Sequence, residues 1–283
     1  MLWQIVLAAH ALFATDLDGT LVDRFDGVHP RDREAIARAR AEGIVVTIAT
    51  GRLTTRTHPV AKDLGLAAPL VCADGGVIAC GATERVLERR AIATHHVENI
   101  LSTFAQHELS SFVFTHEAIH SCERGREHHG YVSGWAHQIT THSDVLAADV
   151  WRQDPDSTVM LVGIGDEETT LRVEEVLGGV FPAVERMSFG FGARRVVRFV
   201  ARGTSKATGV AEVARRLEIP ESRVAVIGDW FNDVPMLEWA PRSFAMPHAP
   251  DEVKQTATDV LPQGAVERGP IADALALWMQ SLP

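Results

Sequence analysis

A short apolar segment, Ala11–Thr15, runs directly into the acidic string DLDGTLVD at residues 16–23. An apolar run of this length that stops at polar residues is typical of a buried parallel strand that reaches the edge of a sheet. In open α/β sheets, ligands bind outside the carboxyl ends of the strands, so Asp16 and Asp18 are predicted to border a ligand crevice. The string therefore favours an α/β fold with a site at the end of its first strand.

The next segments continue the pattern of an α/β sheet. Pro30–Glu42 is predicted to be a helix, because Ile36 and Ala39 fall on one face and Gly43 follows as a stop signal. Ile44–Ala49 is apolar and rich in β-branched residues, which indicates a second strand. A strand, a helix and a strand in this order require a right-handed crossover, which makes the two strands parallel.

The same alternation returns late in the chain. Ser205–Leu217 is predicted to be a helix, Arg223–Ile227 a strand, and Gly228–Asp233 the loop that opens another helix. Pro69–Cys72 and Ser243–Met246 are predicted to be further short strands. The two ends of the chain are therefore expected to build one sheet together.

The middle of the chain has a different character, with longer strand-like segments such as Thr158–Ile164 and a predicted helix at Glu167–Leu177. These features indicate a separate mixed α/β unit inserted into the sheet domain. We predict an α/β fold with a Rossmann-like parallel-sheet core from residues 1–81 and 191–283 and an inserted cap domain at residues 82–190. The expected hinges are Gly81 and Gly190–Gly192.

The composition of the chain argues against several classes of protein. The 283 residues include 27 basic and 37 acidic ones, and the resulting formal charge of −10 repels a nucleic acid backbone. No apolar run reaches the roughly 18 residues that a membrane span needs, and residues 1–9 lack the basic residues of a secretory signal. The odd number of cysteines, three, makes a disulfide framework unexpected. We therefore predict a cytoplasmic protein, and its oligomeric state stays open.

The acidic loop after the first strand has the composition of a reaction centre. Asp16 and Asp18 are two residues apart, so one carboxylate can attack while the other moves protons. Like charges this close favour a shared cation, and oxygen ligands with room for water suit Mg²⁺. Gly19 allows a sharp turn and the Thr20 hydroxyl can tie the loop down. The alternative is an ordinary Asx-turn with an Asp-Gly dipeptide.

Two further loops carry groups that suit an anion. Thr50 and Gly51 end the second strand, where a hydroxyl and backbone N–H groups can hold phosphate oxygens, and Arg52 can reach the same anion. A simple helix cap would also explain these residues. Lys206 lies in the first turn of a predicted helix, where it opposes the helix dipole, so it requires a negative partner nearby.

The last loop, GDWFND at residues 228–233, follows a predicted strand directly. Asp229 can complete a metal site, Asn232 can donate to a substrate or phosphate oxygen, and Asp233 can orient Lys206 or the waters of the metal. The alternative is that Asp229 only caps the following helix, but a cap needs one acidic residue and this loop has two.

The four motifs, in this order, resemble those of the haloacid dehalogenase superfamily, in particular its Cof-type sugar-phosphatase-like branch with a large inserted cap of the C2 type. The resemblance rests on DLDGTLV at 16–22, IATGR at 48–52, GTSKATGV at 203–210 and GDWFND at 228–233. It covers nearly the whole core, whereas the cap matches only in position and length. Many relatives have an Asn-Gly pair after the third strand, and this chain has Asp74 before Gly75 and Gly76.

This resemblance implies a phosphatase that acts on small phosphate esters, such as sugar or cofactor phosphates. Asp16 would attack phosphorus and form an aspartyl-phosphate, while Asp18 would protonate the leaving oxygen and later deprotonate the hydrolytic water. Mg²⁺ would be held by the Asp16 carboxylate, the Asp18 carbonyl and Asp229. Phosphate binding would fall to Thr50, Gly51, Arg52, Lys206 and Asn232, with Thr20 and Asp233 in support.

Other functions are compatible with parts of the pattern. A phosphomutase would use the same two aspartates but return the phosphoryl group to its substrate, and a catalytically silent binding module would lack some of these groups. The predicted cap is rich in histidine, for example His128 and His129 beside Glu127. We interpret these histidines as solvated side chains rather than as a second metal site.

Overall fold

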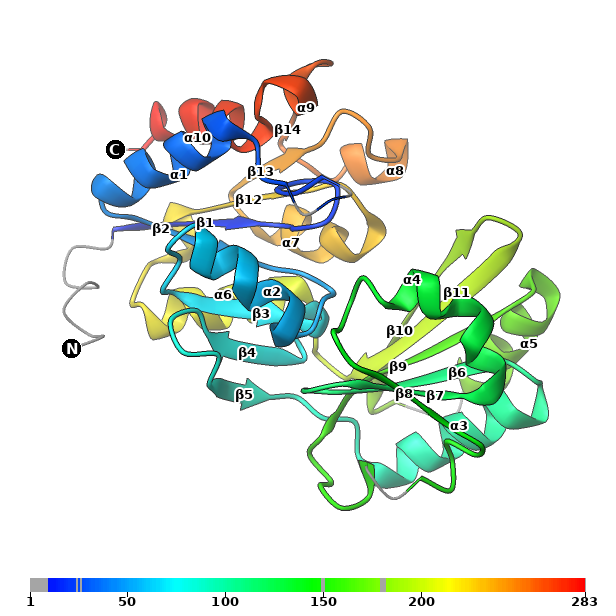
Figure 1. The fold of residues 1–283 in the computed structure, drawn as a ribbon. Helices are drawn as coiled ribbons and strands as arrows, with labels where there is room; N and C mark the ends of the chain where they lie inside the picture. Colours follow the sequence, from blue (N-terminus) through cyan, green and yellow to red (C-terminus); the bar gives the residue numbers. More distant parts are fainter. Residues whose placement is uncertain (1–9, 24, 26, 149–150, 179–181, 283) are drawn as a thin grey trace. The chain divides into compact units, whose positions relative to one another are not determined.

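The computed structural model describes residues 10–23, 25, 27–148, 151–178 and 182–282 (Figure 1). Residues 1–9, which were considered above as a secretory signal, lie outside the described residues. The chain divides into two compact units. The first unit contains the chain up to Gly51, Thr57–Arg85 and the chain from Ser205, and the second contains Arg52–Arg56 and Val86–Thr204.

The first unit is built on a parallel sheet with the strand order β14-β13-β12-β1-β2. Its strands are β1 (Ala11–Thr15), β2 (Ile44–Ile48), β12 (Val224–Gly228), β13 (Arg242–Ala245) and β14 (Asp259–Val260). Every pair of neighbouring strands in this sheet is parallel. The prediction that the two ends of the chain share one parallel sheet is therefore confirmed.

A further strand follows the edge of β2. Thr50 N donates to Val71 O at 2.9 Å, next to a parallel bridge between Ala49 and Val71. Val71 belongs to β3 (Pro69–Cys72), which pairs antiparallel with β4 (Val77–Cys80). The short 3₁₀ turn Ala73–Gly75 connects the two strands. This arrangement brings the β3–β4 turn close to the end of β2.

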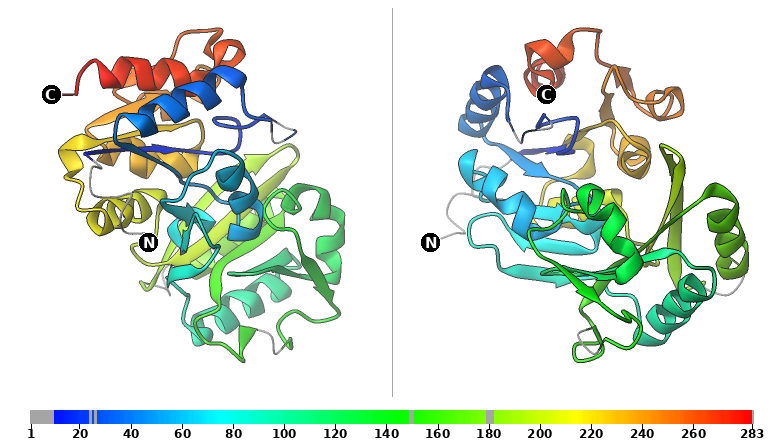
Figure 2. Two further views of the ribbon diagram at one scale, coloured as in Figure 1. Left: turned by 60° about the vertical axis from the view of Figure 1, so that its left-hand side comes forward. Right: turned by 45° about the vertical axis from the view of Figure 1, so that its right-hand side comes forward.

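Helices cover both faces of the sheet. The helices of this part of the chain are α1 (Pro30–Ala41), α2 (Thr54–Asp63), whose first residues are grouped with the second unit, α6 (Lys206–Arg216), α7 (Val234–Trp239), α8 (Asp251–Lys254), α9 (Ala265–Arg268) and α10 (Pro270–Met279). In both figures α1 and α10 lie side by side on one face, and Figure 1 shows α6 and α7 on the other (Figures 1 and 2). The sheet is thus covered on both faces, as its apolar strands require.

Apolar packing fixes the pair α1 and α10 against the sheet. The buried face of α1 includes Ile36 and Ala39, as predicted, and α10 buries Ile271 and Trp278. The Trp278 ring packs against Phe13 of β1 with 5.8 Å between ring centroids. Each large side chain buried in this way stabilises the fold by about 1.5–3 kcal/mol.

The second unit holds a six-stranded mixed sheet with the order β10-β11-β9-β6-β7-β8. The elements of this unit are β5 (Val86–Arg89), α3 (Thr94–Gln106), β6 (Ser110–Thr115), β7 (Ile119–Cys122), α4 (His129–Val132), β8 (Ile139–His142), β9 (Thr158–Gly165), α5 (Glu167–Gly178), β10 (Val184–Phe191) and β11 (Arg194–Ala201). Strand β5 is not part of the six-stranded sheet. A buried cluster that includes Phe104 of α3, Leu161 of β9 and Val173 of α5 joins both helices to the sheet. The predicted mixed α/β character of the middle segment is present.

The sheet of the second unit extends further along the chain than the predicted cap. Strand β11 pairs with β9 and β10, so this sheet continues to Ala201. Gly190 pairs with Arg195 inside the β10–β11 hairpin. The hinge predicted at Gly190–Gly192 therefore falls within a hydrogen-bonded hairpin, and it stays a prediction. The domain boundaries at 81/82 and 190/191 stay predictions.

Two observations bear on the expectations from composition. Within the described ranges, no helix has the combined length and apolar character needed to cross a membrane. The three cysteines, Cys72, Cys80 and Cys122, all lie in the described part of the chain and form no disulfide bond there.

Asp32 makes the stability of the first unit depend on pH. Its side chain is buried in α1, Oδ1 accepts from Ala272 N at 2.8 Å, and Oδ2 has no hydrogen-bond partner among the described residues. Burial raises the pKa of Asp32 from 3.8 to about 6. The folded chain therefore holds this proton more tightly than the unfolded chain, and the free energy of unfolding falls as pH rises from about 4 to about 6.

We expect Asp32→Asn to remove this decline, which amounts to up to about 3 kcal/mol for a pKa shift of about two units. Urea unfolding at pH 4 and pH 7 measures the effect, with Asp63→Asn, an exposed aspartate, as the matched control. An identical change with pH in the wild-type and Asp32→Asn chains would contradict it.

Candidate active site

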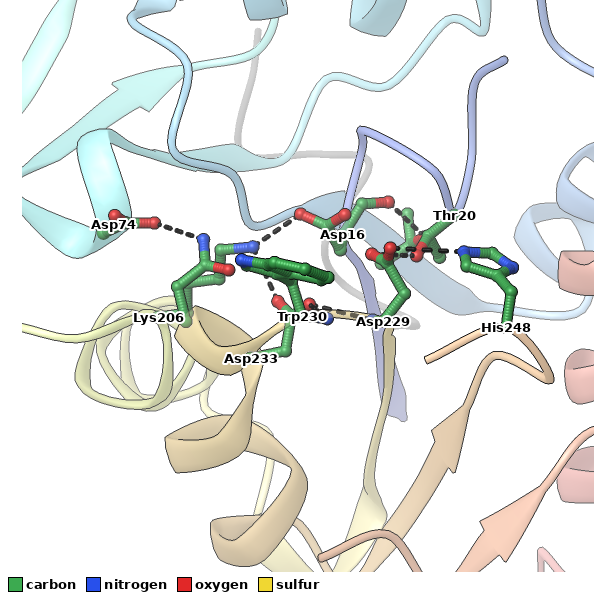
Figure 3. A network of polar contacts seen from close by, with 10 residues as sticks. Asp16, Thr20, Asp74, Lys206, Asp229, Trp230, Asp233 and His248 are labelled. Atoms are coloured by element: carbon green, nitrogen blue, oxygen red, sulfur yellow. Dashed lines mark hydrogen bonds and ion pairs between the residues drawn. The ribbon is translucent and has the colours of Figure 1, made fainter. Parts of the chain in front are cut away.

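Polar side chains gather at the carboxyl ends of neighbouring strands of the first unit. Asp16 follows β1, Thr50 follows β2, and Asp229 follows β12. All three side chains are buried, although each is polar. Because parallel strands end at one edge of the sheet, loops that are far apart in sequence meet there. Figure 3 shows the resulting network.

Lys206 lies at the centre of the network. Its Nζ donates to Asp16 Oδ1 at 2.5 Å and to Asp233 Oδ1 at 2.6 Å, and only 1% of the residue is exposed (Figure 3). A capping box between Ser205 and Thr208 begins helix α6 and fixes the position of the lysine. The negative partner expected for a lysine in this helical turn is thus present twice.

Asp233 closes the GDWFND turn. Its Oδ2 accepts from the backbone N–H groups of Asp229 and Trp230, both at 2.9 Å, while its Oδ1 accepts from Lys206. A Cβ at position 228 would lie 2.4 Å from Asp233 Cγ, so only glycine fits beneath this carboxylate. Asp233 therefore supports both the loop and the lysine.

Asp229 is held by side chains from two other segments. Its Oδ1 accepts from Thr20 Oγ1 at 3.1 Å, and its Oδ2 lies 3.2 Å from His248 Nε2. His248 was not among the site residues predicted from the sequence. The rule that found the other groups would have identified it, because His248 follows closely on the predicted strand Ser243–Met246.

Asp74 joins the network at its other end, beside the predicted phosphate ligands. Asn232 Nδ2 donates to Asp74 Oδ1 at 2.8 Å, and Asp74 N donates to Thr50 O at 3.0 Å. The backbone of Asp74 is left-handed, with φ of 52°. This conformation turns the β3–β4 loop so that Asp74, a departure from the family pattern, contacts Asn232.

The structure also places three further predicted residues. Asp18 is exposed on the loop after β1, where the chain passes through a bridge between Asp18 and Val22. Gly51 lies next to Thr50 at the end of the first segment of the first unit. Arg52 is buried and is grouped with the second unit, so its role stays a prediction.

Burial and neighbouring charges shift the pKa values of the groups in the network. Burial alone would lower the pKa of Lys206, but Asp16 and Asp233 outweigh it and raise the pKa well above its usual range. Burial raises the pKa of Asp16 and of Asp233, and the Lys206 ammonium opposes this rise. The pKa of His248 is raised by its hydrogen bond to Asp229. Lys206 is therefore charged at neutral pH.

The carboxylates have the character of a site for a divalent cation. Oxygen atoms of Asp16, Asp229 and Asp233 lie within 4.8 Å of one another. Three carboxylates and the one ammonium of Lys206 leave a formal excess of two negative charges, and hard oxygen ligands suit Mg²⁺. Lys206 and two backbone N–H groups already hold Asp233, so Asp16 and Asp229 are the better placed ligands. The residues present thus fit a magnesium ion.

Comparison with known protein families shows to which family the chain belongs. Residues 13–275 match the family of haloacid dehalogenase-like hydrolases. The chain belongs to this family. The match covers most of the chain and includes all four motifs, so the predictions of the family and of a hydrolase are confirmed.

Named relatives of this family member include phosphatases. The chain is 26% identical to a 5-amino-6-(5-phospho-D-ribitylamino)uracil phosphatase of Bacillus subtilis, over 95% of this chain and 95% of that protein. It is also 26% identical to a pyridoxal phosphate phosphatase of Escherichia coli, over 88% of this chain and 92% of that protein.

Solved structures share the fold of this family member. A haloacid dehalogenase-like hydrolase from Bacteroides thetaiotaomicron aligns with a TM-score of 0.77 at 21% identity, over 95% of this chain and 99% of that chain. A haloacid dehalogenase-like hydrolase from B. subtilis aligns with a TM-score of 0.79 at 23% identity, over 93% of this chain and 98% of that chain. The predicted α/β fold class is confirmed by this agreement.

Proposed function

We propose that this chain is a Mg²⁺-dependent phosphatase that hydrolyses small phosphate monoesters through an aspartyl-phosphate on Asp16. The observation that carries the proposal is the placement of the Asp16 carboxylate, which is buried, contacts Lys206 and lies within 4.8 Å of Asp229 and Asp233. A carboxylate between an ammonium and a site for a divalent cation can approach a phosphate dianion, which an isolated carboxylate would repel.

Asp16 and Asp18 have different roles in the reaction: Asp16 is the nucleophile and Asp18 is the general acid and base. The Asp16 side chain attacks phosphorus in line, and the ester oxygen leaves as its bond to phosphorus breaks. Asp18 gives a proton to that oxygen and later takes one from the water that hydrolyses the aspartyl-phosphate. The exposure of Asp18 supports this role, because a proton donor must reach both the leaving group and water.

The groups at the other strand ends bind the phosphoryl oxygens. Lys206 neutralises the charge that develops in the transition state, and the Asn232 amide and the Thr50 hydroxyl donate hydrogen bonds. Gly51 contributes its backbone N–H, and Arg52 contacts the substrate. When bound by Asp16, Asp229 and the Asp18 carbonyl, Mg²⁺ would supply further positive charge at the same oxygens.

The relatives suggest the class of substrate. The two phosphatases compared above are named for small phosphate esters, one of a ribitylamino-uracil and one of pyridoxal. We therefore propose a sugar-like or cofactor-like phosphate ester as the substrate, with a cap near residues 82–190 as the source of specificity. We keep the predictions that the chain binds neither nucleic acid nor a membrane and that it is cytoplasmic.

Release of inorganic phosphate from an aryl phosphate tests the function directly. We expect turnover with Mg²⁺, its loss in EDTA, and its recovery when excess Mg²⁺ is added back. Equal turnover with and without EDTA would contradict the metal dependence. A sugar phosphate that is isomerised without release of phosphate would identify a phosphomutase instead.

Asp18→Asn tests the proton transfer. We expect kcat for an alkyl phosphate to fall by about 10²–10⁴-fold, because the alkoxide leaving group then receives no proton from the enzyme. Cleavage of an aryl phosphate with an acidic phenol needs less help in its first step, so a burst of phenol should remain in stopped-flow traces. A variant with wild-type kcat on the alkyl phosphate would exclude Asp18 as the acid.

A further inference from the structure

His248 contacts the network from a segment that none of the four motifs includes. It follows β13, and its Nε2 lies 3.2 Å from Asp229 Oδ2 (Figure 3). An ionised carboxylate only accepts hydrogen bonds, so the ring nitrogen at this distance is the donor. About 44% of the side-chain surface of His248 is exposed, and the ring therefore lies at the rim of the network.

Both oxygens of Asp229 are fixed by this arrangement. Thr20 donates to Oδ1 and His248 to Oδ2, so the plane of the carboxylate is held from two sides. The two donors come from the loop after β1 and the loop after β13. Without the second donor, the carboxylate could rotate about its terminal torsion, which has broad energy minima.

The loop after β1 is shaped to leave room for this contact. Gly19 has a positive φ of 78°, and a Cβ there would lie 2.8 Å from Asp229 Oδ2 and 3.6 Å from His248 Nε2. A side chain at position 19 would thus push against the carboxylate, and its Cβ would lie in ordinary van der Waals contact with the ring. The absence of a side chain at this residue lets the loop backbone pass directly beside the pair formed by Asp229 and His248.

We propose that His248 is a positioning residue that holds Asp229 in its metal-binding orientation and thereby sets the affinity of the chain for Mg²⁺. This inference rests on the proposed function, in which Asp229 is a ligand of the metal. Groups that hydrogen-bond to a ligating carboxylate typically change metal affinity by about 10–100-fold when they are removed. His248 acts through Asp229, so it affects metal binding more than the chemical step.

Metal binding to the full-length chain tests the proposal without any substrate. Isothermal titration with MgCl₂ should give a Kd for His248→Ala that is about 10-fold or more above that of the wild type. His248→Gln keeps an N–H donor of similar reach and should recover most of the affinity. The matched control is His137→Ala, which removes an exposed histidine of the second unit and should leave the Kd unchanged.

Kinetics separate positioning from chemistry. With saturating Mg²⁺, His248→Ala should keep kcat for an aryl phosphate within about threefold of wild type, while the Mg²⁺ concentration for half-maximal rate rises as the Kd does. Circular dichroism and thermal unfolding check that the variant folds, and His248→Gln carries the comparison if the alanine variant does not.

Three results would overturn the inference. A wild-type Kd in His248→Ala would show that Asp229 needs no support from the ring. A much larger loss of Ni²⁺ than of Mg²⁺ affinity would identify His248 as a ligand in its own right, because imidazole suits Ni²⁺ whereas Mg²⁺ prefers oxygen ligands. A wild-type chain that binds no Mg²⁺ at all would instead remove the proposed function, and this inference with it.

Discussion

Asp16→Asn is expected to reduce the turnover of phosphate esters by about 10⁴-fold or more. The amide has nearly the shape of the carboxylate but lacks the nucleophilic oxygen, so no aspartyl-phosphate forms. Steady-state release of phosphate from an aryl phosphate at saturating Mg²⁺ measures the loss. The fold should persist, because Lys206 keeps its ion pair with Asp233 and a neutral side chain is less costly to bury than a carboxylate.

The matched control is Asp23→Asn in the same loop. Asp23 is exposed and its Oδ1 accepts from the backbone N–H groups of Phe25 and Gly27, so its replacement changes the loop without touching Lys206. We expect this variant to keep most of the activity of the wild type. Phosphate release by folded Asp16→Asn at more than a tenth of the wild-type rate would exclude Asp16 as the nucleophile.

Lys206→Met is expected to have the second largest effect, on both stability and turnover. The substitution leaves the buried carboxylates of Asp16 and Asp233 without their common partner. Removal of one member of a buried ion pair typically lowers the free energy of unfolding by about 3–5 kcal/mol. Turnover should fall by about 10²–10³-fold, because a charge that stabilises the transition state is lost. Urea unfolding and steady-state kinetics measure the two effects.

A second substitution distinguishes charge from packing. If uncompensated carboxylates destabilise Lys206→Met, then Asp16→Asn in the same chain should restore part of the lost free energy of unfolding. Lys62→Met, at an exposed lysine of α2, is the control and should leave stability nearly unchanged. A double variant no more stable than Lys206→Met would show that the charge argument is wrong.

The strand that precedes Asp16 and the helix that begins at Lys206 could be predicted from the sequence alone. The strand Ala11–Thr15 has the predicted bounds, and the helices α1 and α6 differ from their predictions by a residue at one or both ends. Apolar periodicity and capping residues are local signals, so they are readable in a short stretch of chain. The rule that strands end at one edge of a parallel sheet then predicted that the acidic loops meet.

The tertiary structure alone decided how these loops contact one another. Asn232 binds Asp74 across 158 positions of sequence, and His248 binds Asp229 from a strand end that carries no motif. The continuation of the second sheet through β11 was equally unpredicted, because the hairpin pairing depends on β9, which lies earlier in the chain. Local patterns along the chain were enough to identify the strands, the helices and an acidic strand end. Only the folded chain decided which carboxylate each donor holds, because hydrogen bonds between distant segments leave no periodic signal in sequence.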